Sequence, residues 1–288
     1  MKAFTTVGIF SKQEGEQVTP TVQALREFLE ARGLAVLASD YPASILNVPA
    51  LPADELATRI DLAVVVGGDG TLLTAGRLLA GHEVPIVGIN LGRLGFLVDV
   101  SPDEMQDQLD AILQGSFIEE RRCLLQASAW RGNDKLGENF ALNDVVLHAR
   151  NEVRMIEFTT YIDGSFVNTQ RADGIVISTP TGSTAYALSS GGPILHPSLD
   201  ATVLVPISPH TLSSRPLVIS NHSHIEIELC SQRPVDSLLS FDGHHDIELL
   251  SGDRIHIKAR QEKMRLLHPR HYDYYHILRS KLHWGRQP

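Results

Sequence analysis

The chain has 288 residues, of which 43% are hydrophobic and 20% charged; this balance excludes wholesale disorder, and the length allows a full hydrophobic core. A net charge of -9 argues against a protein that coats nucleic acid but leaves room for a locally basic pocket, and two cysteines are too few for a disulfide framework. No signal peptide and no unbroken apolar run of membrane-spanning length is visible, so we expect a cytoplasmic protein without nucleic-acid or membrane partners.

The first part of the chain alternates between short apolar runs and helical patterns, as α/β domains do. Strands are predicted at residues 7–10, 34–38, 62–66 and 84–89. Thr19 before Pro20 predicts the N-cap of a helix that ends at Gly33. A capping box formed by Ser101 and Glu104 predicts a second helix, which ends near residue 115.

After about residue 118 the pattern changes to short segments rich in β-forming residues. Residues 225–229 and 255–258 alternate between apolar and polar side chains, and Asp163–Gly164 predicts a hairpin turn. The predicted fold class is an α/β N-terminal domain followed by an all-β C-terminal domain. The expected boundaries are residues 1–118 for the α/β domain, 119–268 for the all-β domain, and 269–288 for an aromatic C-terminal segment that docks on a domain.

A glycine-rich loop follows the buried strand predicted at residues 62–66. Residues 67–71 read Gly-Gly-Asp-Gly-Thr, and a helix is expected to start at Thr71. Such a loop brings backbone N–H groups and a helix N-terminus to one point, which suits a phosphate. Asp69 would repel a phosphate unless it binds a metal ion or accepts a proton, and both roles indicate phosphoryl transfer. The alternative is an ordinary tight turn with Asp69 as the N-cap. The spacing matches neither a dinucleotide fingerprint nor a P-loop.

Three further polar segments are candidate ligand loops. Residues 90–97, Asn-Leu-Gly-Arg-Leu-Gly-Phe-Leu, follow the next strand, and their glycines allow a ligand to approach the backbone. Asn143–Asp144 pairs an amide with a carboxylate, which suits an adenine edge and ribose hydroxyls. Residues 178–193 are dense in hydroxyls and glycines. Each also has a purely structural interpretation, as a loop or an Asx turn.

Other catalytic motifs are not indicated. Residues 178–193 contain no Gly-x-Ser-x-Gly sequence, which a serine hydrolase of the α/β type would carry. The thirteen histidines include His244–His245 and the pair His268 and His271, but neither set has the additional ligands of a zinc site. We interpret these histidines as surface or hydrogen-bonded structural residues.

Four motifs together resemble one family, the bacterial NAD kinases. They are residues 67–71, 90–97 and 143–144 and the Thr-Gly-Ser-Thr-Ala-Tyr run at 181–186, in this order and at about this spacing. The first motif alone also resembles diacylglycerol kinases, sphingosine kinases and 6-phosphofructokinases, whereas the run at 181–186 is much more specific. The resemblance covers nearly the whole chain and implies the two-domain fold of that family.

The resemblance implies that the chain transfers the γ-phosphoryl group of ATP to the 2′-hydroxyl of the adenosine ribose of NAD, with a divalent metal, normally Mg²⁺. It implies Asp69 as the catalytic base, with metal binding as the rival role, and His244 stands where relatives often have Gln. Asn143 and Asp144 would hold adenosine, and Asp173 the other nucleoside. The implied substrate-binding residues are Gly68, Gly70, Thr71, Phe96, Asn143, Asp144, Arg154, Arg171, Asp173, Thr184, Ala185, Tyr186, Ala187, Leu188, Ser189 and His244.

Two other functions remain as alternatives. A lipid kinase of the diacylglycerol or sphingosine type should carry a basic or apolar membrane-facing surface, and this acidic chain shows no basic amphipathic helix. A catalytically silent nucleotide sensor would bind NAD without forming NADP. Relatives form dimers or tetramers, so the resemblance also implies self-association.

Overall fold

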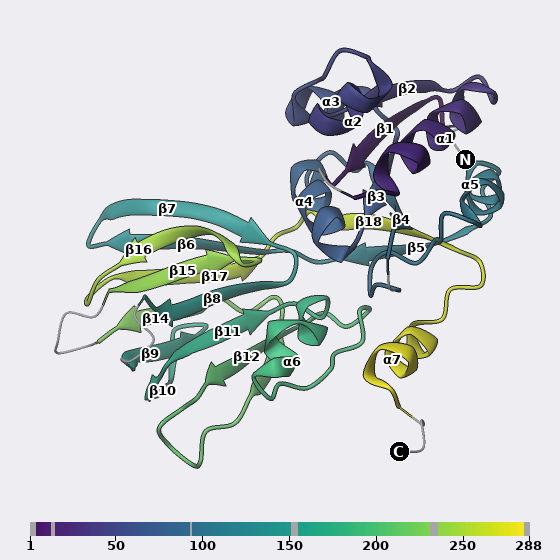
Figure 1. Cartoon of the computed structure of the whole chain (residues 1–288). Helices are drawn as coiled ribbons and strands as arrows, with labels where there is room; N and C mark the ends of the chain where they lie inside the picture. The colour runs from purple at the N-terminus through teal and green to yellow at the C-terminus, as the bar shows by residue number, and fades with distance from the viewer. Residues whose placement is uncertain (1–3, 13–14, 93, 151–154, 231–235, 285–288) are drawn as a thin grey trace. The chain divides into compact units, whose positions relative to one another are not determined.

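The computed structural model describes residues 4–12, 15–92, 94–150, 155–230 and 236–284, and the chain divides into two compact units (Figure 1). Unit 1 comprises residues 1–121 and 264–288, and unit 2 comprises residues 122–263. The divisions therefore lie a few residues from those expected at 118 and 268. Residues 117–122 and 264–269 form two strands of the sheet in unit 1, which explains the difference.

Unit 1 is built on one six-stranded sheet. Its strands are β1 (Thr6–Ser11), β2 (Ala35–Ala38), β3 (Leu62–Gly67), β4 (Pro85–Asn90), β5 (Phe117–Arg122) and β18 (Met264–Pro269), in the order β2-β1-β3-β4-β18-β5. The strands from β2 to β18 are parallel. β3 and β4 are buried along their whole length, as interior parallel strands usually are. Gly67 is the register partner of Asn90, so the loops that follow β3 and β4 start side by side.

Six helices accompany this sheet in the described part of unit 1. They are α1 (Val18–Glu30), α2 (Asp40–Leu46), α3 (Ala53–Arg59), α4 (Asp69–Leu79), α5 (Met105–Leu113) and α7 (Tyr274–Leu282). The expected N-cap at Thr19 is wrong, because α1 begins at Val18. Pro20 is tolerated in the first turn of α1, since the first N–H groups of a helix have no partner within it. The capping contact between Ser101 and Glu104 is present just before α5.

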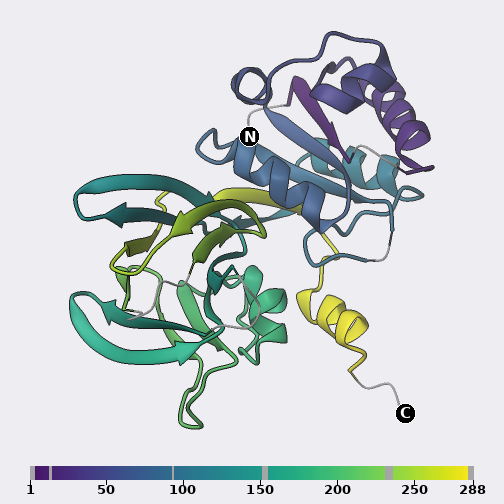
Figure 2. The same cartoon turned by 60° about the vertical axis from the view of Figure 1, so that its left-hand side comes forward.

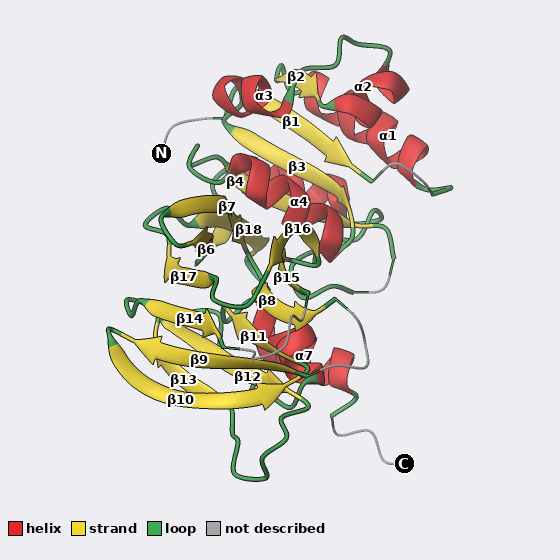
Figure 3. Ribbon diagram, turned by 90° about the vertical axis from the view of Figure 1, so that its left-hand side faces the viewer, coloured by secondary structure: helices red, strands yellow, loops and turns green. Residues whose placement is uncertain are grey.

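Unit 2 is a sandwich of two six-stranded antiparallel sheets (Figures 2 and 3). The first has the order β10-β9-β14-β17-β6-β7 and the second β13-β12-β11-β8-β15-β16. The strands are β6 (Leu125–Arg131), β7 (Asp134–Ala141), β8 (Asp144–Ala149), β9 (Ile156–Ile162), β10 (Ser165–Ala172), β11 (Gly174–Ser178), β12 (Ala201–Ile207), β13 (Leu217–Ser220), β14 (Ile225–Leu229), β15 (Ser237–Phe241), β16 (His244–Leu249) and β17 (Arg254–Ala259). Phe158 of one sheet and Phe241 of the other are fully buried in their common core.

The predicted fold class is confirmed: an α/β unit and a β-rich unit. The hairpin at Asp163–Gly164 joins β9 to β10, and both residues have positive φ, as a type I′ turn requires. The outer face of the second sheet carries a short helical segment, η1 (Gly182–Thr184) and α6 (Tyr186–Ser189), whose Ala187 packs on Val146 and Val176. Within the described residues, no helix has both the length and the apolar character needed to cross a membrane.

Candidate active site

The glycine-rich loop forms the junction between β3 and α4 in unit 1. Gly68 is the N-cap and Asp69 is the first helical residue, so the expectations of a helix start at Thr71 and of Asp69 as the N-cap are both wrong. A Cβ at Gly67 would lie 2.5 Å from Oγ1 of Thr71, so a side chain there would displace the first turn of α4. The free N–H groups of that turn and the helix dipole favour a phosphate at this junction.

The Asp69 carboxylate is held by the loop that follows β4. Oδ2 accepts the N–H of Phe96 at 2.8 Å, and Oδ1 accepts the N–H groups of Leu97 and Val98 at 3.0 and 3.2 Å. A Cβ at Gly95 would clash with this carboxylate, so glycine is required there. The negative charge of Asp69 is therefore matched by three amide dipoles, which fix the side chain in place, a structural role that the sequence did not indicate.

The loop itself is also bonded to β3. The N–H of Leu91 donates to the carbonyl of Gly67 at 3.2 Å, and Oδ1 of Asn90 accepts the N–H of Gly92 at 3.0 Å. The two glycine-containing loops predicted from the sequence are thus one hydrogen-bonded assembly, in which Asp69 lies at the centre.

A cavity of about 370 Å³ adjoins the start of α4 in unit 1. Its lining residues come from the end of β1, the start of α2 and one side of α4: Phe10, Ser11, Lys12, Ser39, Asp40, Tyr41, Gly70, Thr71, Thr74, Ala75 and Leu78. Gly70 and Thr71 are the residues here that the sequence predicted. Lys12, the cation of this cavity, belongs to no motif, and only the parallel topology brings it to the glycine-rich loop.

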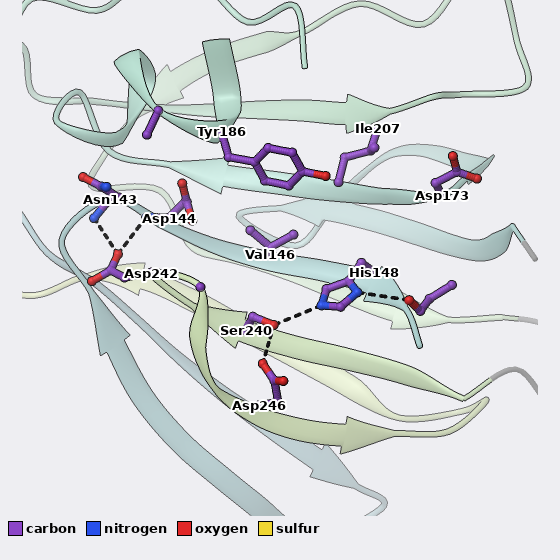
Figure 4. A pocket seen from close by; sticks show the side chains of 13 residues that line it. Asn143, Asp144, Val146, His148, Asp173, Tyr186, Ile207, Ser240, Asp242 and Asp246 are labelled. Carbon is purple, nitrogen blue, oxygen red and sulfur yellow. Dashed lines mark hydrogen bonds between the residues drawn. The ribbon is translucent and has the colours of Figure 1, made fainter. Parts of the chain in front are cut away.

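A larger cavity, of about 720 Å³, lies in unit 2 on the outer face of the second sheet (Figure 4). It is lined by Asn143, Asp144, Val146, His148, Ala149, Asp173, Ala185, Tyr186, Ile207, Ser240, Asp242, Gly243 and Asp246. The alternation of β8 explains the position: Val145 and Leu147 point into the sandwich core, so Asp144, Val146 and His148 lie on the opposite face. Tyr186, 46% exposed, borders the cavity from α6.

Two aspartates define one end of this cavity. The Asp242 carboxylate accepts the backbone N–H groups of Leu142, Asn143 and Asp144 at 3.0, 2.7 and 3.2 Å, respectively. Burial and the adjacent Asp242 charge raise the pKa of Asp144 to about 7. A Cβ at Gly182 would clash with the backbone of Asn143, so close packing also holds this turn in place. The Asn143–Asp144 pair is therefore a rigid polar edge with one carboxyl that titrates near neutral pH.

A chain of hydrogen bonds lines another side of the cavity. Nδ1 of His148 lies 3.0 Å from the carbonyl oxygen of Ala149, and Nε2 lies 3.0 Å from Oγ of Ser240. The Ser240 hydroxyl donates to Asp246. Figure 4 shows these side chains along the floor of the cavity. The sequence reasoning missed all three side chains. The alternation of β8 and β15, which places a polar residue next to buried ones, was a signal for His148 and Ser240 but not for Asp246 on β16.

The predicted site residues divide into groups. Asn143, Asp144, Asp173, Ala185 and Tyr186 line the larger cavity, as described above. The cavity lining does not include Thr184, Ala187, Leu188, Ser189, Arg171 or His244. Ala187 is fully buried against the sheet, and the Thr184 hydroxyl donates to the carbonyl of Thr181; both stabilise the turn that carries Tyr186. Arg171 and His244 are exposed, and Arg154 lies outside the described residues.

Comparison with known proteins matches both parts of the chain to one family. A family model described as "ATP-NAD kinase N-terminal domain" matches residues 7–117, and one described as "ATP-NAD kinase C-terminal domain" matches residues 142–269. NAD kinase of Pseudomonas entomophila is 46% identical over 99% of this chain and 97% of its own length. NAD kinase of Thiobacillus denitrificans is 47% identical over 99% of this chain and 98% of its own length.

Solved structures give the same result. The crystal structure of yeast NADH kinase complexed with NADH has a TM-score of 0.87 at 27% identity, covering all of this chain and 90% of the other. The structure of an NAD kinase from Archaeoglobus fulgidus in complex with ATP has a TM-score of 0.74 at 27% identity, covering 97% and 98% of the two chains.

A glycine-rich strand–helix junction in an α/β unit, and a polar cavity on a β-sandwich, define an enzyme of the nucleotide-dependent phosphotransferase class. More specifically, the chain belongs to the ATP-NAD kinase family.

Proposed function

We propose that the protein transfers the γ-phosphoryl group of ATP to the 2′-hydroxyl of the adenosine ribose of NAD and so produces NADP. The observation that carries this proposal is the match to NAD kinases along 99% of the chain, which includes the Asp69 loop and the residues of the larger cavity. Phosphoryl transfer through a loose transition state depends on alignment and charge neutralisation more than on covalent catalysis. The glycine-rich loop and the loop after β4, which together fix Asp69, suit such positioning.

The larger cavity is the proposed site for NAD. The Asn143 amide offers a donor and an acceptor to an adenine edge, and the Asp144 carboxylate can accept from a ribose hydroxyl. The half-exposed ring of Tyr186 offers a stacking surface. His148, Ser240 and Asp246 supply further polar atoms for hydroxyl groups. NADH in the related yeast structure supports a dinucleotide ligand for this family.

The glycine-rich junction is the proposed site for the ATP phosphates. The free N–H groups at the start of α4 favour binding of an anion. Lys12 lines the adjacent cavity together with Thr71. The A. fulgidus structure in complex with ATP supports ATP as the phosphoryl donor. Asp69 would orient the acceptor hydroxyl and accept its proton late in the transfer, because its Oδ2 accepts only one of the three amide hydrogens.

We propose Mg²⁺ as the divalent ion of the reaction. The described residues contain no group of three or more His, Cys, Asp or Glu side chains suited to a metal ion, and both Asp69 oxygens already accept amide hydrogens. In the part of the chain that the structure describes, the residues do not form a protein cage for a metal ion. Mg²⁺ often keeps several waters and binds through substrate phosphates, so we place it with ATP, whose charge it would reduce.

We also propose that copies of the chain associate through β13, an edge strand of unit 2. Leu217 and Val218 on this strand are 40% and 45% exposed, and its outer edge has no neighbouring strand in the described sheet. A dimer or tetramer would cover these two side chains.

The two cysteines are free thiols, which suits the reducing cytoplasm.

A coupled assay tests the reaction directly. Purified protein incubated with NAD, ATP and Mg²⁺ should form NADP, detected with an NADP-specific dehydrogenase, and mass spectrometry should show the added phosphate on the adenosine half. Diacylglycerol offered as the acceptor should remain unphosphorylated. NAD binding without NADP formation would instead indicate a silent sensor.

A further inference from the structure

A buried charged cluster in unit 1 takes no part in the proposed chemistry. His268 on β18 has no exposed surface, and its Nδ1 lies 3.0 Å from Oδ2 of Asp99. Its Nε2 lies 3.3 Å from Oε2 of Glu120 on β5. The ring of Tyr272 stacks on the imidazole with 3.8 Å between centroids. Three segments distant in sequence thus meet at one imidazole.

The geometry favours the charged form of this imidazole. Nδ1 is within hydrogen-bond distance of Asp99, and Nε2, which has no hydrogen-bond partner among the described residues, lies within ion-pair distance of the Glu120 carboxylate, so two negative charges flank the ring. Burial acts to lower the pKa of His268, but the contacts with Asp99 and Glu120 outweigh it and leave the pKa above its ordinary value. The ionisable side chains facing the ring are Asp99 from the loop after β4, Glu120 from β5, and Tyr272 from the segment after β18.

The cluster is directly connected to the loop that holds Asp69. Asp99 follows Val98 in the chain, and Phe96, Leu97 and Val98 supply the three N–H groups that the Asp69 carboxylate accepts. His268 therefore fixes the loop next to these donors.

The C-terminal helix makes a second, independent contact with the same loop. Nζ of Lys281 on α7 lies 5.6 Å from the centroid of the Phe96 ring, within the range of a cation–π interaction. Lys281 and His268 thus contact the two ends of the loop of residues 96–99, at Phe96 and at Asp99, and this loop supplies the N–H groups that hold Asp69.

We propose that the C-terminal segment, β18 and α7, positions Asp69 for phosphoryl transfer, and that His268 and Lys281 are positioning residues that act through the loop of residues 96–99. The inference rests on the proposed function, because it assigns these residues to the step in which Asp69 acts. It gives the last part of the chain a role in turnover without contact with a substrate.

The test compares turnover with NAD binding in His268→Gln. Gln keeps one donor but no charge, so Asp99 and Glu120 are no longer paired with a cation at this position. We expect kcat to fall about 10-fold, because small misplacements of catalytic groups cost up to about 100-fold, while the NAD dissociation constant from calorimetry stays at the wild-type value. In wild-type protein kcat should decline as the pH rises through the pKa of His268, and the variant should lack this decline. His256→Gln, on β17 in unit 2, is the matched control and should behave as wild type.

If the variant His268→Gln does not fold, Lys281→Met provides a second test of the proposal. It removes the charge near Phe96 at a partly exposed position and should lower kcat several-fold, whereas Lys258→Met on β17 should not. A lower melting temperature with unchanged kcat and an unchanged pH profile in both variants would overturn the inference. If wild-type protein forms no NADP, the proposed function fails instead, so the two failures are distinguishable.

Discussion

At the scale of single residues, the same arrangement occurs twice. Asp69 and Asp242 each precede a glycine, and each carboxylate accepts three consecutive backbone N–H groups from a distant segment. The sequence identified Asp69 as an unusual acid but could not supply its partners, which lie 27 to 29 residues away. Asp242 was missed as a site residue, because its partners are 98 to 100 residues away and a lone Asp-Gly pair is an ordinary turn.

The titration of Asp144 gives a prediction at this scale. Its folded-state pKa is about 7 against an ordinary value of 3.8, so the folded protein binds this proton more tightly than the unfolded chain. The contribution of Asp144 to the free energy of unfolding therefore falls as the pH rises from about 4 to about 7. Above about pH 7 the full destabilisation by its ionised form is present. Asp144→Asn should raise the melting temperature more at pH 8 than at pH 5, as measured by scanning calorimetry. An equal effect at both pH values would contradict the raised pKa.

At the scale of elements, continuous runs of apolar residues predicted the interior strands well. Residues 62–66 and 84–89 correspond to β3 and β4, because strands buried on both faces show as continuous apolar runs. The two seven-residue helices α2 and α3 were missed, since they are too short for a clear helical period. β18 was expected in the all-β domain, because a strand's pattern does not reveal which sheet it joins.

The loop after β4 gives the prediction at this scale. Gly95→Ala places a methyl group against the Asp69 carboxylate and should force the loop and the side chain apart. We expect kcat to fall by about 10- to 100-fold, in line with the cost of misplacing catalytic groups, with little change in the calorimetric dissociation constant for NAD. Turnover at the wild-type rate would show that the clash is relieved without moving Asp69.

At the scale of the whole molecule, the pattern of predicted elements and the family resemblance were sufficient for the fold class, but the discontinuity of unit 1 was not visible in the sequence. Unit 1 is discontinuous, since its sheet includes β18 from beyond unit 2. Likewise, five of the residues expected to bind nucleotide line the larger cavity, yet His148, Ser240 and Asp246 join them only through antiparallel pairing of β8, β15 and β16.

Self-association is the prediction that belongs to the whole molecule. If β13 forms the contact between copies, Val218→Lys should shift the mass measured by light scattering toward the monomer, because a charge on an exposed edge strand opposes pairing. Thr169→Lys, on β10, an edge strand of the other sheet of unit 2, is the comparison and should leave the mass unchanged. An unaltered mass for the Val218 variant would place the interface elsewhere.

The role of Asp69 is tested most directly by measuring turnover and NAD binding together in Asp69→Asn. The amide replaces one acceptor oxygen with a donor, so it fits three N–H groups poorly and accepts no proton. The account predicts that NADP formation falls by about 100-fold or more, the usual effect of losing a proton-accepting group, while calorimetry still shows NAD bound at the wild-type affinity. NADP formation at the wild-type rate, or loss of NAD binding along with it, would contradict the account.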